Sequence, residues 1–288
     1  GVLRTNGVDL EFICARPVPA NSLSLTPSDV SLKVDLSSAA VWGVDPGLRD
    51  AFVAVDGNHQ ERHKIRTTTT AEYYQLAGFN KATITRRKIG SLNLFNAAAI
   101  YIFNNFLIKK QQTLSEISKR LITGSRKYDP TRHMVIEDSN KKWKQLSLGD
   151  GPEESNKPVV LAFGAAMFGN LRGNVPAPTK VVKDSLIKFA RERNKKVPTY
   201  VVMIDEYLTS QICPRCQTRT TSNEKNSSGL KIHPVLKCST CDTRWNRGHM
   251  ASMNIRSVFL YIAQNNNNRP KVFRRTYSLI LTYILYNI

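Results

Sequence analysis

Short apolar runs alternate along the chain with longer amphipathic or polar stretches. Residues 39–57 predict a hairpin, in which one apolar strand ends at Asp45, the chain turns, and a second strand covers Phe52–Val55. QERHKIRT, residues 60–67, is a candidate third strand. Three further runs, HMVIEDS, PVVLAFGAAMF and TYVVMIDEY, are also typical of strands.

Helical patterns separate these strands. Residues 71–123 predict mainly helix, and residues 178–196 predict an amphipathic helix that turns Val181, Leu186 and Phe189 toward the core. HMASMNIRSVFLYIA predicts a last helix, which NNNNRP ends. This order of elements predicts an α/β fold with a mixed sheet. It also fits an RNase H-like fold, in which acids at strand ends and on the last helix converge.

Four of the five cysteines form two C-x2-C pairs, separated by 21 residues. Two such knuckles at tight turns can aim four thiolates at one ion, which is the closed tetrahedral arrangement of structural zinc. The predicted ligands are Cys213, Cys216, Cys238 and Cys241. Between the pairs, TSNEKNSSG predicts a loop, and His233 is interpreted as a loop histidine rather than a ligand. The fifth cysteine, Cys14, has no partner in sequence and is interpreted as a small buried apolar residue.

Carboxylates follow several of the predicted strands. Asp45 closes VWGV before a Pro-Gly turn, Glu206 closes YVVMIDE with Asp205 on the opposite face, and Glu137 and Asp138 close MVIED. Cleavage of a phosphodiester with two metal ions needs several such groups from distant parts of the chain. The alternative interpretation of Asp45 is an ordinary Asp-Pro-Gly turn, and spacing alone does not decide between the two.

The charge balance points to a polyanion. Lysine and arginine number 42 against 22 acids, which gives a formal charge of +20 and a pI of about 9.9. The basic clusters are scattered, which suits contact with a nucleic-acid backbone rather than reading of bases. The candidate nucleic-acid-binding residues are Arg86, Arg87, Lys88, Lys141, Lys142 and Lys144. Trp143 is either a base-stacking residue or packs on its own domain.

Two classes of protein are disfavoured. No signal peptide is visible, and no apolar run reaches the roughly 18 residues of a membrane span. Two tight cysteine pairs in a basic chain favour metal in a reducing compartment over a disulfide scaffold. We therefore expect an intracellular protein with no membrane partner.

A resemblance to a known family rests on four motifs. GVDPGLRDAFVAVDG, VVLAFGAAMFGNLRGNVPAPTK, IDEYLTSQICPRC with CSTC, and RWNRGHMASMNI are similar to the RuvC and zinc-ribbon half of the Fanzor proteins. Fanzor proteins are eukaryotic relatives of the transposon-encoded TnpB (OrfB-type) proteins, which are RNA-guided DNA endonucleases. The most specific element is E-Y-x-T-S-x-x-C-x-x-C, joined to the second cysteine pair and a W-N-R helix start.

The resemblance implies roles for individual residues. Asp45 matches the first RuvC acid. In TnpB-like proteins the second acid ends the strand that resembles VVLAFGAA, where this chain has Gly164 and Ala165. Fanzor-like proteins commonly lack that acid as well, and Glu206 matches the glutamate that stands in for it. Glu137 would need a different alignment and ranks below Glu206.

The third acid is where the chain departs from the family. The pattern W-N-R-D reads Trp245-Asn246-Arg247-Gly248 here, with His249 next. Each carboxylate at a Mg²⁺ ion is both ligand and neutralising charge, so its loss weakens the site. Imidazole suits Mg²⁺ poorly, and His249 is interpreted as a surface residue at a helix start.

The resemblance also divides the chain. It implies a RuvC-like domain over residues 1–210 with a helical insertion at about 70–125, an inserted zinc ribbon over 211–246, a last RuvC-like helix over 247–264, and a basic and apolar tail over 265–288. The half that holds guide RNA in such proteins is not in this sequence. We therefore expect a fragment or diverged copy.

Three functions are compared. The favoured one is a nucleic-acid-binding protein with structural zinc, DNA and guide RNA as partners, a nuclear location, and impaired Mg²⁺-dependent DNA cleavage. The alternatives are an active half of an RNA-guided DNA endonuclease and a non-catalytic zinc-ribbon RNA-binding protein. Gly248 argues against the first alternative, and the strand-end acids argue against the second.

Overall fold

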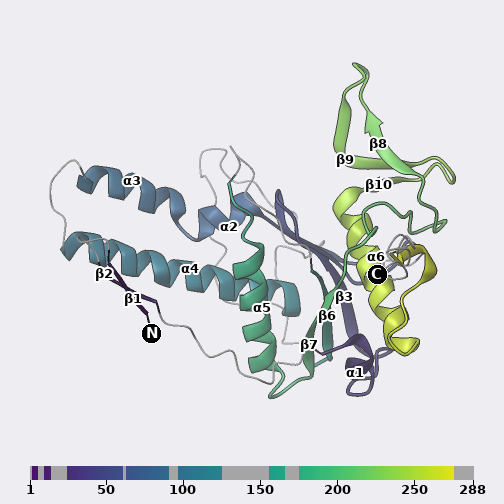
Figure 1. The fold of residues 1–288 in the computed structure, drawn as a ribbon, viewed down its shortest axis with the longest axis horizontal. Helices are drawn as coiled ribbons and strands as arrows, with labels where there is room; N and C mark the ends of the chain where they lie inside the picture. The colour runs from purple at the N-terminus through teal and green to yellow at the C-terminus, as the bar shows by residue number, and fades with distance from the viewer. Residues whose placement is uncertain are drawn as a thin grey trace, which may run out of the picture.

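A five-stranded mixed sheet forms the centre of the molecule. The computed structural model describes residues 2–5, 10–13, 25–60, 63–90, 97–124, 156–165 and 175–275. The strand order is β5-β4-β3-β6-β7. The strands are β3 (Ala40–Asp45), β4 (Asp50–Val55), β5 (Ile65–Thr69), β6 (Val159–Gly164) and β7 (Thr199–Ile204). Figure 1 shows the sheet between two groups of helices.

The first three strands form an antiparallel meander, and the last two are parallel to β3. The hairpin predicted over residues 39–57 is confirmed, with Asp45 opposite Val53. The third strand begins at Ile65, later than the predicted 60–67, and His63 and Lys64 just before it lie outside the strand. β6 pairs with both β3 and β7 in parallel, and its burial on both faces accounts for its unbroken apolar run.

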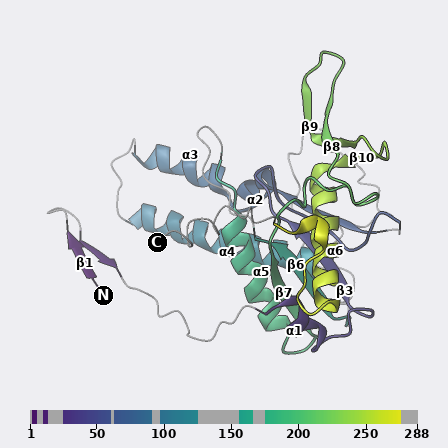
Figure 2. The ribbon, with the colours of Figure 1, turned by 45° about the vertical axis from the view of Figure 1, so that its right-hand side comes forward.

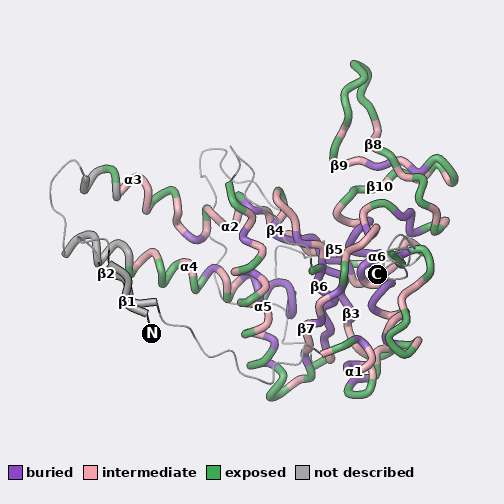
Figure 3. Tube along the Cα trace, viewed as in Figure 1, coloured by how far each residue is buried: buried purple, intermediate pink, exposed green. Residues whose placement is uncertain are grey.

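Helices from the middle of the chain cover one face of the sheet. They are α2 (Thr70–Leu76), α3 (Phe79–Gly90), α4 (Ala97–Thr123) and α5 (Thr179–Arg193). α4 and α5 pack on each other and share an apolar core with Trp42, Phe52 and Phe163. The central strands are the most deeply buried part of this arrangement (Figure 3).

The inward face of α5 differs partly from the prediction. Leu186 is buried as expected, but Val181 and Phe189 are only partly buried. Val182 and Ala190 are buried instead. The helix is rotated by about one position, which follows from the 100° step between neighbours in a helix with 3.6 residues per turn.

The last helix covers the other face. α6 (Arg247–Gln264) packs on β3 and, with the short helix α1 (Pro27–Ser31), closes a second apolar core. Gly43 is required in β3, because a Cβ at this position would overlap the backbone of α6 at Ser252. Helix and sheet therefore touch backbone to backbone two residues before Asp45.

The chain continues beyond α6 against this second core. The 3₁₀ helix η2 (Lys271–Phe273) places Phe273 in the core, where it is 2% exposed. Residues 265–275, expected as the first part of a basic tail, are thus packed on the body of the protein.

A three-stranded antiparallel sheet lies between β7 and α6 in the sequence. It contains β8 (Thr221–Lys225), β9 (Lys231–Cys238) and β10 (Arg244–Asn246). The predicted loop TSNEKNSSG is partly wrong, because its first residues form β8, and His233 lies exposed on β9 rather than in a loop. The β8–β9 hairpin projects beyond the amino-terminal end of α6 in both views (Figures 1 and 2).

The remaining described elements are a small hairpin of β1 (Val2–Thr5) and β2 (Leu10–Ile13). In the part of the chain that the structure describes, no helix has the length and apolar character needed to cross a membrane. The expected α/β class, a mixed sheet flanked by helices with an inserted four-cysteine unit, is confirmed.

Candidate functional site

Asp45 lies at the carboxyl end of β3, on the face that α6 covers. Val41 of this strand belongs to the core under α6, and side chains two residues apart share a face, so Asp45 points to the same side. The side chain is half-buried at the rim of that core. The β3–β6 register pairs Val44 with Phe163, so Gly164 is the next position beside Asp45.

Glu206 reaches the same place from β7. The strand ends at Ile204, which pairs with Gly164, and the chain then turns so that the Glu206 side chain lies over Gly164. A Cβ at position 164 would overlap the Glu206 carboxylate, so a residue with a side chain at 164 and the observed Glu206 conformation exclude each other. The carboxylate thus occupies the space that a side chain at the end of β6 would otherwise fill.

The two acids influence each other. Burial raises the pKa of Asp45 well above its ordinary value, and the neighbouring charge of Glu206 raises it further. The positive charge of Arg247, at the start of α6, lowers the pKa of Asp45, whereas the negative charge of Asp50 raises it. Like charges close together disfavour ionisation, so a cation bound between the two carboxylates would stabilise both of their ionised forms.

Asp50 is an acid that the sequence analysis did not single out. It begins β4, and its charge acts on both Asp45 and His249. Its position after the Gly47 turn, at the start of a strand rather than the end, hid it from a search for acids that follow strands. The signal that could have found it is the antiparallel pairing, which brings the start of β4 to the end of β3.

Gly248 lies in the first turn of α6, next to this group. Asn246 caps the helix by accepting a hydrogen bond from the His249 N–H at 3.2 Å. A Cβ at position 248 would lie 2.9 Å from Cγ2 of Val53, the residue that pairs with Asp45. A side chain at 248 would therefore enter beside Asp45, but only after the Val53 methyl group moved.

His249 differs from the interpretation as a surface residue. It is half-buried, and burial together with the neighbouring His63 lowers its pKa. Asp50 acts in the opposite direction. Burial and His63 both favour the neutral form of the imidazole.

The four predicted cysteine ligands come together. Their sulfur atoms lie within 4.8 Å of one another, and this is the one group of three or more potential ligands found in the described ranges. The Sγ separations are 3.6 Å for Cys213 and Cys241 and 3.5 Å for Cys216 and Cys238. Four thiolates about 2.3 Å from a tetrahedral ion would lie about 3.8 Å apart, so the set fits a single metal ion such as zinc.

Hydrogen bonds tune these thiols differently. Burial raises the pKa of Cys213 to about 12, and the Trp245 Nε1–H donates to its sulfur at 3.3 Å. Burial also raises the pKa of Cys238, but donors such as the Thr220 hydroxyl outweigh it and bring the pKa to about 5. Trp245 lies three residues before Gly248, so its hydrogen bond to Cys213 links the cysteine group to the start of α6.

The other sequence candidates are placed only in part. Arg87 lies exposed on α3, while Arg86 and Lys88 belong to the same helix. Glu137 and the cluster of Lys141, Lys142 and Lys144 lie outside the described residues. The roles of all these residues remain predictions.

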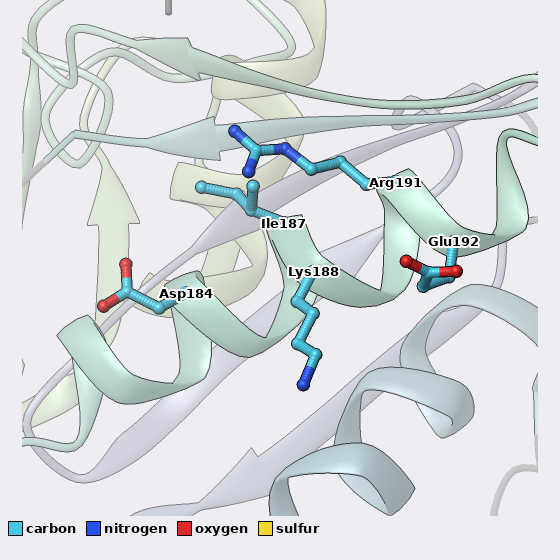
Figure 4. A pocket seen from close by; sticks show the side chains of 5 residues that line it. All are labelled: Asp184, Ile187, Lys188, Arg191 and Glu192. Carbon is cyan, nitrogen blue, oxygen red and sulfur yellow. The ribbon is translucent and has the colours of Figure 1, made fainter. Parts of the chain in front are cut away.

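A shallow hollow lies along the outer side of α5, away from the acid pair. Its lining residues all come from this one helix, as Figure 4 shows. They are Asp184, Ile187, Lys188, Arg191 and Glu192. No group from a second element converges on them in the described structure, so the hollow lacks the arrangement of a catalytic site.

Comparison with known proteins gives one family match. Residues 184–255 match the family model described as Cas12f1-like, TNB domain. This segment runs from α5 through Glu206 and the four cysteines to α6, and it relates this part of the chain to Cas12-like and TnpB-like proteins. No curated protein matches the chain.

Three solved structures show distant likenesses. A Cas12f1–sgRNA–target DNA complex has 12% identity and a TM-score of 0.39, covering 74% of this chain and 48% of that chain. CasPhi-2 (Cas12j) bound to crRNA has 12% identity and a TM-score of 0.37, covering 87% and 52%. CasPhi-2 bound to crRNA and phosphorothioate DNA has 11% identity and a TM-score of 0.38, covering 87% of this chain and 49% of that chain. The chain spans about half the length of these structures.

Proposed function

We propose that this chain is the RuvC-like and zinc-ribbon half of a Fanzor/TnpB-type RNA-guided DNA endonuclease, with impaired cleavage. The observation that carries the proposal is the Glu206 carboxylate lying over Gly164 beside Asp45. Two half-buried carboxylates at the ends of separate strands, close enough for one to raise the pKa of the other, match the one or two carboxylates by which proteins usually hold Mg²⁺. The segment that matches Cas12f1-like proteins contains one of them.

The proposal assigns the acids and the cysteines to different metal ions. Asp45 and Glu206 hold Mg²⁺, which would supply charge neutralisation at the scissile phosphate. Their carboxylate oxygens suit this hard cation, whereas the cysteine sulfurs suit zinc. Because four thiolates leave no open position, the zinc is structural and holds the ribbon at the start of α6.

Gly248 is the reason for the impaired cleavage. The first turn of α6 contains no acid, and a side chain there would enter beside Asp45. Groups that act together on a reaction lose most of their effect when one is removed, so we expect cleavage weaker by orders of magnitude than in a chain with all three acids. In Fanzor/TnpB-type proteins, delivery of the target strand additionally needs a part that holds the guide RNA.

The nucleic-acid partners are proposed from charge and resemblance together. A formal charge of +20 favours DNA and guide RNA, and a nuclear location would bring the chain to its target. Electrostatic binding must weaken with salt. We expect the affinity for a random duplex to fall at least tenfold between about 50 and 200 mM salt. A salt-independent affinity would contradict the electrostatic basis of binding.

The experiment for the nuclease proposal is single-turnover cleavage of a labelled single strand in Mg²⁺ and in Mn²⁺. The variants are Gly248→Asp, Asp45→Ala and Glu206→Gln, with a guide-holding half of a related nuclease supplied in parallel. We expect trace cleavage for the chain as it stands, an increase for Gly248→Asp with the supplied half, and no cleavage when either Asp45 or Glu206 is changed in that background. Cleavage that persists without both acids would overturn the proposal.

A second candidate, an active nuclease half, is favoured by Asp50. Its charge reaches Asp45 from β4, so a third carboxylate at this edge of the sheet exists without α6. In this case the unmodified chain would cleave robustly, Asp50→Asn would abolish cleavage, and Gly248→Asp would add little. The same assay therefore separates the two candidates.

A further inference from the structure

The turn that follows Glu206 is strained. Leu208 has a φ of +64°, in the left-handed region that residues with a side chain rarely adopt. Such a conformation persists only where the surrounding structure holds it, and it concentrates at functional sites. Leu208 lies two residues after Glu206, so the groups that hold this turn also decide where the Glu206 carboxylate lies.

The first of these groups is Thr209, which is 2% exposed. Its N–H donates to the Glu206 carbonyl oxygen at 3.1 Å, and its hydroxyl donates to the same oxygen at 2.9 Å. Thr209 is the threonine of the E-Y-x-T-S motif. Its double contact closes the turn directly onto the backbone of the glutamate.

The second group comes from α6. Asn254 is 1% exposed, and its Nδ2 donates to the carbonyl oxygens of Thr209 and Ile212, both at 2.7 Å. One amide therefore spans the segment between Glu206 and the first metal-binding cysteine. Because Asn254 lies on α6, which has Gly248 in its first turn, it fixes the spacing between the glutamate and the start of that helix.

The third group comes from the segment after α6. Arg269 Nη2 donates to the carbonyl oxygens of Asp205 at 2.7 Å and Tyr207 at 3.2 Å, the two residues that flank Glu206. Arg275 forms a two-pronged contact with the Asp205 carboxylate at 3.0 and 3.2 Å, and its guanidinium lies 4.7 Å from the centre of the Tyr207 ring. Asp205, which the sequence placed beside Glu206 as a nearby acid, is thus engaged by arginines.

We propose that Thr209, Asn254 and Arg269 are positioning residues that hold the Glu206 carboxylate over Gly164. This inference rests on the proposed function, since it assigns the device to the proposed cation site. Without these bonds Leu208 relaxes to an ordinary backbone conformation, and Glu206 moves away from Asp45. The segment after α6 is then part of the site's support rather than a dispensable tail.

The test measures Mn²⁺ binding by electron paramagnetic resonance on the full, zinc-loaded chain. The variants Thr209→Val, Asn254→Leu and Arg269→Met each remove donors at similar volume. We expect each to weaken Mn²⁺ binding about 3-fold to 10-fold, the loss of one or two hydrogen bonds. Thr209→Ser keeps the hydroxyl and should bind Mn²⁺ as the unchanged chain does.

Two controls distinguish the possible failures. Ser118→Ala removes a buried hydroxyl on α4, which bonds to Leu114 and Ser185, so it lowers stability without approaching the acid pair. Glu206→Gln removes a proposed ligand. If Glu206→Gln leaves Mn²⁺ binding unchanged, the cation site itself is refuted. A different result would overturn the positioning role alone. In that case Glu206→Gln weakens Mn²⁺ binding, but Thr209→Val binds Mn²⁺ as tightly as Thr209→Ser and Ser118→Ala do.

Discussion

The cysteine group and the acid pair are two candidate metal sites of opposite construction. The four thiolates come from two short knuckles, and all four lie within 4.8 Å of one another. The acids Asp45 and Glu206 come from strands far apart in the sequence, and the turn of α6 that would add a third carries Gly248. The cysteine group forms one compact set of four potential ligands, whereas the acid pair lacks the third acid that the Fanzor/TnpB resemblance implies.

The difference teaches how each site depends on its surroundings. The thiolates need only their own turns, since two C-x2-C pairs can close on an ion wherever the knuckles meet. The carboxylates need the sheet register, the glycine at 164, the Glu206 turn and the docking of α6 all together. Loss of one ligand therefore has different consequences at the two sites.

The largest expected effect comes from breaking the cysteine group. Cys213→Ser should abolish stoichiometric zinc binding and unfold the ribbon first, because metal binding at such sites supplies about 10 kcal/mol of folding free energy. Metal analysis and hydrogen exchange of residues 211–246 would measure it. Cys14→Ser is the matched control and should keep one zinc. Full zinc content in Cys213→Ser would show that the four-thiolate site is misidentified.

The next effect tests the close approach at the acid pair. Gly164→Ala should displace Glu206, because the added methyl group would overlap its carboxylate. We expect Mn²⁺ affinity to fall about tenfold, close to the value for Glu206→Gln, and the double variant to be no worse than either. Additive losses in the double variant would mean that position 164 acts independently of Glu206.

The third change makes the two sites more alike by restoring an acid. Gly248→Asp should tighten divalent-cation binding by about tenfold, roughly 1.4 kcal/mol. The Val53 methyl group lies 2.9 Å from the new Cβ, so Gly248→Asp combined with Val53→Ala should bind more tightly than Gly248→Asp alone. Titration calorimetry with Mn²⁺ would measure both. An unchanged affinity in both variants would contradict the placement of position 248 beside the acids.

A smaller effect follows from the raised pKa of Asp45. Asp45 binds its proton more tightly in the folded protein than in the unfolded chain, where its pKa is 3.8. The folded protein therefore loses stability as the pH rises from this value through the pKa in the folded state. Asp45→Asn should therefore raise the melting temperature by a few degrees at pH 7 and little at pH 4. Thermal melts at the two pH values, without divalent cations, would decide. Equal shifts at both would mean that ionisation of Asp45 is not the cause.

The smallest effect concerns Trp245, which links the cysteine group to the start of α6. Trp245→Phe removes the N–H donor to Cys213 while keeping an aromatic ring. We expect one zinc to remain bound, with its affinity lowered about 3-fold to 10-fold by the loss of one hydrogen bond. A zinc competition assay would measure the shift. A loss as large as that of Cys213→Ser would mean that Trp245 holds the ribbon together by itself.

The sequence determined much of this protein by local pattern. The apolar runs identified β3, β4, β6 and β7, and the cysteine spacing identified the four thiolates, because both signals lie within a few residues. Strand ends also singled out Asp45 and Glu206, and the resemblance singled out the missing acid at Gly248. Their catalytic roles stay predictions.

The tertiary structure alone decided how these residues meet. No local pattern reveals that Glu206 lies over Gly164 or that Arg269 bonds to the residues on both sides of Glu206. The contacts of Arg269 with Asp205 and Tyr207 join positions 64 and 62 residues apart, and their geometry is set by sheet register and helix docking. The physical reason is that side-chain position depends on the packing of the whole core, whereas turns and strands depend mainly on neighbours in the chain.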